Sequence, residues 1–472
     1  MDWDSALAQA RLAQRAWASA TVAQRLKPVR ALRHRLVSNC DQLLALLSDE
    51  LHKSTLESLG GDVLTTADAL AWLERRAARL LAPRTIPSSD RPLALWGQSD
   101  TVHRRPRGVV GIIGTWNYPL FLNAVQICQA LVAGNAVIWK PSEVAPRFAE
   151  WFASVMSEVG WPAHLFQTMP ATREGGAQLA DAAIDHVVFT GSANVGRKLA
   201  AHLGARLIPS TLELSGCDAM LLLDDADVEL AAKAAAFGVS INRGQTCIAV
   251  RRVLLPRDQV EAFTQALLRH LPTQAHRLQL PAQEEQAKRL VDDALSQGAR
   301  LLTAPGGPIV LGEVRPTMAL CREAAFAPIV GLLPYHDLAT ALNDETLCPL
   351  ALSFSIFTAT PSRAQSIAAT LRAGSVCIND VIAPTAHPAT PFGGRGESGW
   401  GVTQGAEGLL EMTVPQVVSV RSGRFRPHYE QTPNQEPLLR GLLAANHAPT
   451  LAARLAGWWQ LLRAAIKGGS RP

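Results

Sequence analysis

One cysteine stands out for the chemistry that its neighbours allow. Cys247 lies among small and polar residues in the segment 240–249, after an Ala-rich helical run and before the strand-like residues 252–255. A thiol at a turn between a helix and a strand is accessible, and a helix end or a neighbouring base can activate it as a nucleophile. Free cysteines more often pack in cores, so this segment alone does not establish catalysis.

Two further polar side chains follow apolar, strand-like runs. Glu213 lies inside the run 211–214, where partial burial would raise its pKa and suit the carboxylate to general-base work. Asn117 follows the apolar segment 109–113 and a sharp turn, and its amide is the kind of donor that an oxyanion hole uses. The structural alternatives are a carboxylate at a strand end and a plain turn.

These three segments, in this order, resemble the aldehyde dehydrogenase superfamily over about residues 8–420. Asn117 matches the oxyanion Asn of the family's Trp-Asn-Tyr/Phe-Pro motif, and Glu213 matches the Glu of Leu-Glu-Leu-Gly-Gly. Cys247 matches the nucleophile of Gly-Gln-x-Cys. The resemblance implies NAD(P)-dependent oxidation of an aldehyde to the acid through a cysteine thiohemiacetal and a thioester, with Cys247, Glu213 and Asn117 as catalytic residues.

The resemblance also implies the architecture, an α/β fold with a Rossmann-type cofactor domain, an α/β catalytic domain and a small β arm for oligomerisation. We expect the NAD-binding domain at 1–84 and 106–212, the arm at 85–105 and 413–423, the catalytic domain at 213–412, and a C-terminal linker with an amphipathic helix at 424–472. We expect a homodimer.

From Gly108 onward strands alternate with helices, which predicts a parallel sheet. Lys140 and Glu143 follow the strand 136–140, at the edge where such sheets bind ligands, unless they form an ordinary surface turn. By resemblance they contact the adenosine ribose. A carboxylate there would repel a 2'-phosphate, so NAD is expected and NADP is the alternative.

A glycine-containing turn follows the strand 186–190 and opens a helix. Such a turn presents backbone N–H groups to phosphate. Its Gly-x4-Gly spacing is neither the dinucleotide fingerprint nor a P-loop. By resemblance Ser192 touches the pyrophosphate, and the implied cofactor-binding residues are Trp116, Lys140, Glu143, Gly191, Ser192 and Phe326.

Two departures from the family's motifs concern the active site. Ala324 stands where the family has the Glu that binds the nicotinamide ribose, and Ser215 replaces the first Gly of Leu-Glu-Leu-Gly-Gly. Loss of a charge-assisted hydrogen bond weakens binding by ~1.5–3 kcal/mol. Glu323 could substitute only if its loop shifts. Two alternatives therefore stand beside the dehydrogenase: a catalytically diminished relative and a cysteine esterase or acyl-transfer enzyme.

The substrate is predicted from apolar residues near the motifs. The segments 244–249, 375–380 and 391–399 resemble the fatty- and aromatic-aldehyde (class 3-like) branch, which favours medium-chain, long-chain or aromatic aldehydes. Arg243 holding a substrate carboxylate is the alternative. The expected apolar tunnel consists of Tyr118, Leu120, Leu122, Ile241 and Ile248.

Composition narrows the classes of partner. The 472 residues carry a formal net charge of only +5, and no zinc-finger spacing or RNA-binding motif predicts nucleic acid. The 7 cysteines include no Cys-x-x-Cys pair, which favours a reducing cytoplasm. We expect no metal site, because the acidic residues 224–227 are better explained as the cap of a helix.

The ends of the chain carry the remaining expectations. Helical spacing predicts helices within 2–50 and over 65–81, and residues 97–100 predict the turn of a hairpin. Near the C-terminus, residues 450–467 form a helix with one apolar stripe and basic neighbours. This helix either docks on protein or contacts a membrane peripherally. The stripe residues are Leu451, Leu455, Trp458, Trp459, Leu462 and Ile466.

Overall fold

The computed structural model describes residues 3–92, 95–273, 277–423, 429 and 435–468. The chain divides into two compact units, described separately below. One comprises Met1–Leu81 with Arg105–Val414, and the other comprises Ala82–Arg104 with Pro415–Pro472.

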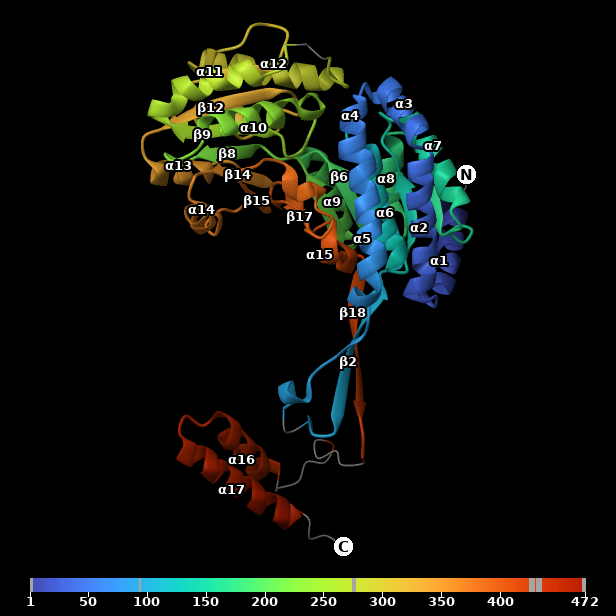
Figure 1. Ribbon diagram of the computed structural model, residues 1–472. Helices are drawn as coiled ribbons and strands as arrows, with labels where there is room; N and C mark the ends of the chain where they lie inside the picture. Colours follow the sequence, from blue (N-terminus) through green and yellow to red (C-terminus); the bar gives the residue numbers. More distant parts are fainter. Residues whose placement is uncertain (1–2, 93–94, 274–276, 424–428, 430–434, 469–472) are drawn as a thin grey trace. The chain divides into compact units, whose positions relative to one another are not determined.

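The first unit contains a six-stranded sheet (Figure 1). Its order is β17 (Gly399–Trp400), β7 (Ser210–Leu214), β6 (His186–Gly191), β3 (Val109–Ile113), β4 (Ala136–Lys140) and β5 (Phe166–Thr168). All pairs are parallel except that of β17 with β7. The chain builds outward from β3 through β4 to β5 and then returns to the other side of β3 with β6. The carboxyl ends of β3 and β6 therefore form a topological switch point, where open α/β sheets bind ligands.

Helices cover this sheet and share one apolar core with it. Strands β3 and β4 are buried along their whole length, which explains their continuous apolar sequences. The connecting helices are α6 (Pro119–Val132), α7 (Pro146–Glu158), α8 (Glu174–Asp181) and α9 (Ala193–Ala205). The N-terminal helices are α1 (Trp3–Ala18), α2 (Val22–Ser38), α3 (Cys40–Leu51), α4 (Thr55–Ser58) and α5 (Thr65–Leu80).

The helix predicted over 65–81 is observed as α5, and helical structure that was not predicted precedes it. Ser54 and Glu57 form a capping box that begins α4, and a π-helical turn, Leu59–Leu64, joins α4 to α5. A π-helical turn changes which side chains point inward, and such turns are frequent at functional sites. Here the turn buries Asp62.

A seven-stranded sheet forms the other part of the first unit. Its order is β10 (Arg300–Leu301), β11 (Ile309–Gly312), β12 (Ile329–Tyr335), β9 (Val250–Pro256), β8 (Asp218–Leu222), β14 (Ser353–Phe357) and β15 (Ser375–Ile378). Alternation along β8 decides the two faces: Ala219 and Leu221 pack with α12 (Pro281–Ser296), α13 (Leu338–Glu345) and α14 (Pro361–Ala368). Met220 and Leu222 pack on the opposite face with α10 (Val228–Ser240) and α11 (Val260–His270).

The acidic residues after β8 have structural partners. The Asp227 side chain accepts from the Leu230 N–H and caps α10. Asp225 accepts hydrogen bonds from Thr358 and Thr360. The interpretation of residues 224–227 as a helix cap is therefore confirmed for Asp227.

The predicted domain boundaries stay a prediction, but the last part of the first unit departs from them. β17 pairs with β7, and α15 (Gly405–Glu411) follows it. Leu409 and Met412 lie in the core of the six-stranded sheet. The chain therefore returns to the six-stranded sheet before residue 412.

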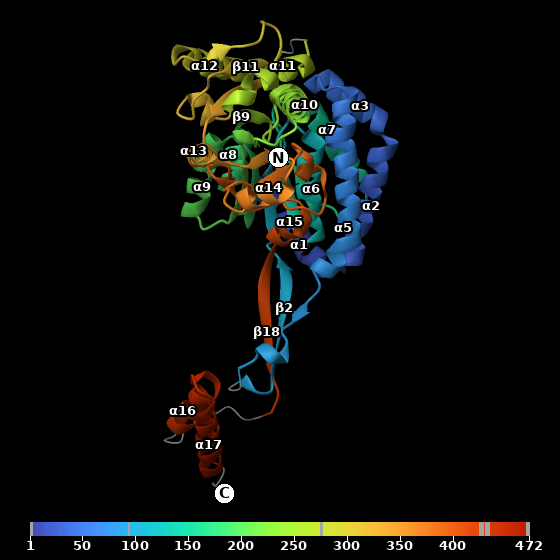
Figure 2. The same ribbon diagram turned by 60° about the vertical axis from the view of Figure 1, so that its left-hand side comes forward.

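The second unit contains a three-stranded sheet of β1 (Arg84–Thr85), β2 (Gln98–Pro106) and β18 (Thr413–Arg421). Figure 2 shows β2 beside β18. The predicted hairpin turn at 97–100 is wrong, because residues 98–100 belong to β2 and the partners of β2 are β1 and β18. Residues 93–94, which precede the predicted turn, lie outside the described residues.

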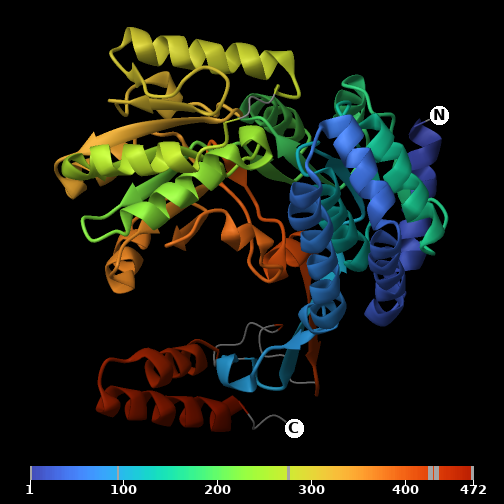
Figure 3. The same ribbon diagram turned by 45° about the horizontal axis from the view of Figure 1, so that its top comes forward.

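Two helices, α16 (Gln435–His447) and α17 (Leu451–Gly468), end the described chain. The sequence predicted α17 but not α16, and the prolines of the predicted linker, Pro427 and Pro433, lie outside the described residues. The two helices lie side by side (Figure 3). Their backbones approach so closely that a Cβ at Gly457 would come within 2.3 Å of the Ala445 nitrogen. No helix among the described residues has the length and apolarity needed to cross a bilayer.

Candidate active site

One wall of the candidate site lies at the carboxyl ends of the strands of the six-stranded sheet, where several predicted site residues are found. β3 leads into Trp116 and Asn117, and β4 ends at Lys140. β6 ends at Gly191, and β7 contains Glu213 at its penultimate position. Because these strands are parallel, the five residues lie along one edge of the sheet, at and beside the switch point.

The other wall comes from the amino ends of the seven-stranded sheet. The segment 241–249 precedes β9, and the segment 323–328 precedes the neighbouring strand β12. The buried Arg251 guanidinium donates to the carbonyls of Gly244 and Ala327, which ties the two segments together. Charge-assisted bonds of this kind hold a loop rigidly where a nucleophile must be placed.

The loop before Cys247 has an unusual backbone. Asn242, Arg243 and Gly244 all have positive φ values, of 47°, 56° and 70°. A Cβ on Gly244 would come within 2.4 Å of the Ala327 carbonyl carbon, so only glycine fits there. Backbone strain is often stored at functional sites.

Cys247 is half-buried and faces apolar residues. It packs against a small cluster of Ile248, Leu352 and Phe392. Its carbonyl accepts a hydrogen bond of 3.2 Å from the Gly216 N–H, which links the nucleophile loop to the segment that follows Glu213.

The Asn117 side chain is buried and held at both ends. The Thr115 hydroxyl donates to Asn117 Oδ1 (2.9 Å), and Asn117 Nδ2 donates to the Gln245 carbonyl (3.1 Å). The Tyr118 and Thr246 hydroxyls share a further hydrogen bond of 2.9 Å. An amide nitrogen carries two N–H groups, so the hydrogen bond to Gln245 uses only one of those of Asn117.

The Glu213 carboxyl is 5% exposed, and neither of its oxygens has a hydrogen-bond partner among the described residues. Burial raises the pKa of this carboxyl well above its usual value, and the nearby Thr403 hydroxyl offsets only part of this rise. A carboxyl with a raised pKa and free lone pairs is suited to take a proton from water.

Burial also raises the pKa of the Cys247 thiol, to about 12, and the neighbouring carboxyls of Asp218 and Glu213 add to the rise. The cysteine is therefore a thiol at neutral pH in the protein without cofactor. Its proton must leave as the sulfur attacks, so a neighbouring base is needed.

We expect the alkylation of Cys247 by iodoacetamide to report this raised pKa. Only the thiolate reacts, so the rate should rise about tenfold per pH unit up to pH 10 without levelling. Mass spectrometry of the tryptic peptide measures it, with Cys247→Ala protein as the background. A plateau near pH 8.5, where an ordinary thiol titrates, would contradict the raised pKa.

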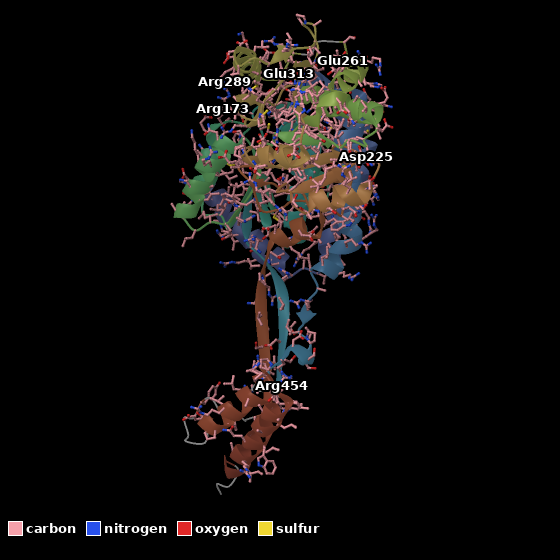
Figure 4. The ribbon with its side chains drawn as sticks, turned by 90° about the vertical axis from the view of Figure 1, so that its left-hand side faces the viewer. Arg173, Asp225, Glu261, Arg289, Glu313 and Arg454 are labelled. Carbon is pink, nitrogen blue, oxygen red and sulfur yellow. The ribbon has the colours of Figure 1, made fainter. Side chains whose placement is uncertain are left out.

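The predicted adenosine-ribose residues form a charged cluster at the end of β4. Lys140 Nζ donates to Glu143 Oε2 (3.0 Å), and Arg173 Nε donates to Glu143 Oε1 (3.2 Å). Burial tends to raise the pKa of Glu143, but its own backbone N–H and Lys140 lower it overall. The sequence interpretation missed Arg173, which lies on the loop before α8 with its side chain 80% exposed (Figure 4).

Gly191 and Ser192 form the turn from β6 into α9. The Ser192 side chain caps α9 by accepting from the Val195 N–H (3.4 Å), and the serine itself is exposed. The first N–H groups of this helix are available to a phosphate, as predicted for the pyrophosphate.

Trp116 and Phe326, from opposite walls of the site, meet in an edge-to-face contact with ring centroids 5.9 Å apart. Phe326 has a φ of 47°, a rare conformation for a bulky residue. These two predicted cofactor-binding residues therefore lie together.

Ala324 packs in an apolar cluster where the family has a carboxylate. Its neighbours are Cys217, Cys348, Leu350 and Ala193. Glu323, which could have substituted for the missing carboxylate, instead forms an ion pair with Arg289 on α12. The residues at the adenosine half thus fit a dinucleotide, and the nicotinamide half lacks the carboxylate that would hold its ribose.

The structure bears on two of the residues considered for substrate binding, Leu120 and Arg243. Leu120 is fully buried in the main core, so it is not part of a tunnel wall. Arg243 donates to the carbonyls of Leu51 (2.6 Å) and Arg277 (2.9 Å), which engages both ends of its guanidinium.

The structure also brings residues to the site that the sequence interpretation missed. Asn242 Nδ2 donates to the Asn117 carbonyl (3.0 Å), and Lys53 Nζ donates to the same oxygen (2.7 Å). Lys53 also pairs with the buried Asp62. The one available signal was an Asp inside the apolar, glycine-containing segment 59–64.

Comparison with known proteins identifies the fold. A model of the aldehyde dehydrogenase family matches residues 1–418. A 4,4'-diapolycopene aldehyde oxidase of Methylomonas sp is 34% identical over 430 residues, covering 87% of this chain and 80% of that protein. A protein of Mycobacterium bovis, provisionally named an NADP(+) succinate-semialdehyde dehydrogenase, is 32% identical over 446 residues, covering 89% and 84%.

Solved structures agree with this. The Mycobacterium tuberculosis aldehyde dehydrogenase complexed with NAD+ superposes with a TM-score of 0.83 at 27% identity, covering 90% of this chain and 91% of that one. An aldehyde dehydrogenase from Sinorhizobium meliloti, described as NAD-dependent, gives a TM-score of 0.84 at 28% identity, covering 90% and 88%. The predicted α/β fold class is confirmed, and the chain belongs to the aldehyde dehydrogenase family.

Proposed function

We propose that the protein uses Cys247, Asn117 and Glu213 to oxidise an apolar aldehyde to its carboxylic acid with NAD(P). As a family member it is an NAD(P)-dependent aldehyde dehydrogenase. The assignment of roles rests chiefly on the contact between the two loops, in which Asn117 Nδ2 donates to the Gln245 carbonyl, two residues before the nucleophile.

Each residue has a distinct task in this proposal. Cys247 Sγ attacks the aldehyde carbon, and its proton is released to a base as the new bond forms. The Asn117 amide and the Cys247 N–H stabilise the oxyanion, each worth roughly 3 kcal/mol in the transition state. After oxidation, Glu213 takes a proton from the water that attacks the thioester, and Cys247 leaves as the acid is released.

The cofactor has a supporting set of residues. Lys140, Glu143 and the N-terminus of α9 would hold its adenosine and pyrophosphate, and the Trp116 and Phe326 rings, which contact each other, would contribute to holding the other half. When bound, NAD(P) supplies the hydride acceptor for the oxidation. Ala324 leaves the nicotinamide ribose without a carboxylate partner, which favours loose binding of that half.

The apolar cluster at Cys247 favours a medium-chain, long-chain or aromatic aldehyde. Ile248, Leu352 and Phe392 pack with Cys247, whereas the guanidinium of Arg243 is engaged by backbone carbonyls. The names of the relatives include both a 4,4'-diapolycopene aldehyde and succinate semialdehyde as substrates.

The test compares kcat/KM for decanal, benzaldehyde and succinic semialdehyde by absorbance at 340 nm. We expect decanal or benzaldehyde to be preferred. A clear preference for the acid would reject the apolar substrate while leaving the chemistry of Cys247 in place.

A second candidate function, thioester or ester hydrolysis without oxidation, is favoured by one observation, the apolar cluster at Ala324. It predicts turnover of p-nitrophenyl acetate that needs Cys247 and no nucleotide. Ala324→Glu, which restores the carboxylate, should raise dehydrogenase turnover if loose nicotinamide binding limits it.

Arg173 is expected to influence the choice between NAD and NADP. Its guanidinium pairs with Glu143, the carboxylate predicted beside the ribose 2'-hydroxyl, and its exposed side chain could turn to a 2'-phosphate. Arg173→Ala should lower kcat/KM for NADP about 10-fold or more and that for NAD by less than about 2-fold, since a bond to a charged group is worth ~1.5–3 kcal/mol.

Matched titrations with both nucleotides measure this, and Arg147→Ala, which removes an ion pair to Asp49 on the same α/β unit, is the control. Equal losses for both nucleotides after Arg173→Ala would contradict a role in discrimination.

The second unit supports association with a second copy of the chain. β18 lies at the edge of its sheet, and Val417 and Val420 on it are 59% and 63% exposed. Exposed apolar edge strands pair readily with other chains. We expect a homodimer by analytical ultracentrifugation and a shift to monomer for Val417→Lys; an unchanged mass would reject this edge as the interface.

The pair α16 and α17 supports a peripheral contact with anionic lipid. The helices cross through glycine and alanine, so the large apolar side chains of α17 stay exposed: Leu455 is 60% exposed and Trp459 59% exposed. Residues 435–468 contain four basic residues (Arg440, Arg454, Arg463 and Lys467) and one acidic residue, Glu436. An apolar face with excess positive charge fits an anionic membrane surface.

We expect the protein to float with vesicles that contain phosphatidylglycerol and not with pure phosphatidylcholine. Replacing Trp459 and Leu455 by Ser should abolish flotation while aldehyde turnover in detergent-free buffer persists. Arg440→Gln, which removes an arginine paired with Glu436, serves as a control of smaller effect. Flotation that survives the double replacement would reject this surface.

A further inference from the structure

We propose that the buried ion pair of Lys53 and Asp62 positions the oxyanion donor Asn117, which makes Lys53 and Asp62 positioning residues for the reaction. The inference rests on the proposed catalytic role of Asn117. Neither residue belongs to the motifs that carry the family resemblance.

The pair is completely enclosed. The side chains of Lys53 and Asp62 are 1% and 0% exposed, and Lys53 Nζ lies 2.7 Å from Asp62 Oδ2. Burying two charges is costly unless the geometry is good and further hydrogen bonds are made. The other hydrogen bonds of Lys53 and Asp62 therefore matter, and the groups that make them are held in place by the pair.

The partners of Lys53 lie in residues 114–118, the loop between β3 and α6, which is called the oxyanion loop below because it contains Asn117. Lys53 Nζ donates to the carbonyl of Asn117 (2.7 Å) and sits 4.1 Å from the centre of the Tyr118 ring. His52, with a φ of 53°, ends α3 in a left-handed cap that turns the chain just before Lys53.

The partners of Asp62 lie in the helix that follows that loop. Asp62 Oδ1 accepts from the N–H groups of Leu120 (3.1 Å) and Phe121 (3.3 Å), in the first turn of α6. A carboxylate there satisfies two N–H groups that have no partner within the helix and complements the helix dipole. The pair thus holds the backbone on both sides of residues 118–119.

A third donor links the same carbonyl to the nucleophile loop. Asn242 Nδ2 donates to the Asn117 carbonyl (3.0 Å) and to the Gln245 carbonyl (3.2 Å), and the Asn242 N–H donates to Glu57 (2.8 Å). Glu57 and Asp62 lie on the same continuous helical segment, α4 and the π-helical turn. That segment therefore fixes the oxyanion loop and the nucleophile loop relative to each other.

The experiment measures single-turnover NADH formation for Lys53→Met, Asn117→Ala and the double variant. Asn117→Ala should slow this step ~10²–10³-fold, as the loss of an oxyanion donor does elsewhere. Lys53→Met should slow it ~10–100-fold, because a small misplacement of a reacting group has effects of that size. In the Asn117→Ala background Lys53→Met should change the rate less than about 2-fold, since both act through one donor.

Binding of NAD, measured by fluorescence titration, should change less than about 2-fold in these variants. The substituted residues are not among the predicted NAD-binding residues, and substitutions at independent sites do not affect each other's contacts. A purely structural role for Lys53 would instead give the same fold-loss in both backgrounds. Arg33→Met is the matched control: Arg33 pairs with the mostly buried Glu74 in the same helical layer and should lower stability without slowing the step.

If Lys53→Met does not fold, Asn242→Gly provides the second test. It removes the other donor to the Asn117 carbonyl and keeps a backbone that tolerates the left-handed conformation. It too should slow the step only when Asn117 is present. An unchanged rate for Asn117→Ala would overturn the proposed function and this inference together, whereas unchanged or additive effects of Lys53→Met and Asn242→Gly would overturn the inference alone.

Discussion

Cys247→Ala should abolish aldehyde oxidation, with turnover falling at least about 10⁴-fold, as removal of a nucleophile does in other covalent enzymes. No other described thiol can replace it in this position. Cys217, Cys321, Cys348 and Cys377 are buried, and Cys128 lies in the core of the six-stranded sheet. The measurement is NADH formation at 340 nm with decanal and either nucleotide.

The control for this result is the folded state of the variant. Cys247 is half-buried and packs with Ile248 and Phe392, so loss of its sulfur should alter the melting temperature only slightly. Cys40→Ala, which removes the other half-exposed thiol, should leave turnover unchanged. Undiminished oxidation by Cys247→Ala protein would reject the covalent mechanism.

Glu213→Gln should separate the two halves of the reaction. The thioester forms before Glu213 activates water, so a burst of about one NADH per site should persist while steady turnover falls ~10²–10⁴-fold, the usual contribution of a general base. Rapid-mixing absorbance at 340 nm measures both phases, and mass spectrometry should detect the acylated Cys247. If the burst disappears as well, Glu213 is also the base for the attack by the thiol.

The same variant tests the raised pKa of Glu213 through stability. Burial keeps the carboxyl protonated in the folded protein above the pH at which it ionises in the unfolded chain. Between these two pKa values the folded state binds more protons, so this group makes the wild type less stable as pH rises above about 4.5. Urea unfolding of Glu213→Gln should lack this contribution to the pH dependence, and identical pH dependence in both proteins would contradict it.

The candidate reacting groups could be named from the sequence because each lies in a short local pattern. Cys247, Glu213 and Asn117 lie in turns or strand ends whose neighbours are adjacent in sequence, so type and spacing point to them. The strands β3 and β4 were predicted with their observed bounds, because strands buried on both faces are continuous apolar runs.

The residues that hold those groups could not be predicted, because their partners are distant in the chain. Lys53 reaches a carbonyl 64 residues away, and Asn242 reaches the same carbonyl from 125 residues away. Arg173 likewise becomes a candidate cofactor-binding residue only because the fold places it beside Glu143. A charged residue in a sequence is expected to lie on the surface, and only the folded structure shows that Lys53 is enclosed.

The sequence of α17 illustrates the limit from the other side. Its apolar stripe predicted either docking on protein or contact with a membrane. The structure packs α17 on α16 through Gly441 and Gly457, where the absence of a Cβ lets the backbones approach. Which face of a helix is covered depends on the shape of its neighbour, and α16 was not predicted.

The sequence by itself thus predicted the fold class, which the comparisons confirm, and it named Cys247, Glu213 and Asn117 as the candidate nucleophile, base and oxyanion donor, because the motifs that hold them are short local patterns. Only the tertiary structure decided how the carboxyl edge of one sheet meets the amino edge of the other. It also decided that Glu323 pairs with Arg289 and that Lys53 is enclosed with Asp62. Those features arise from contacts between segments far apart in the chain, and no local pattern contains them.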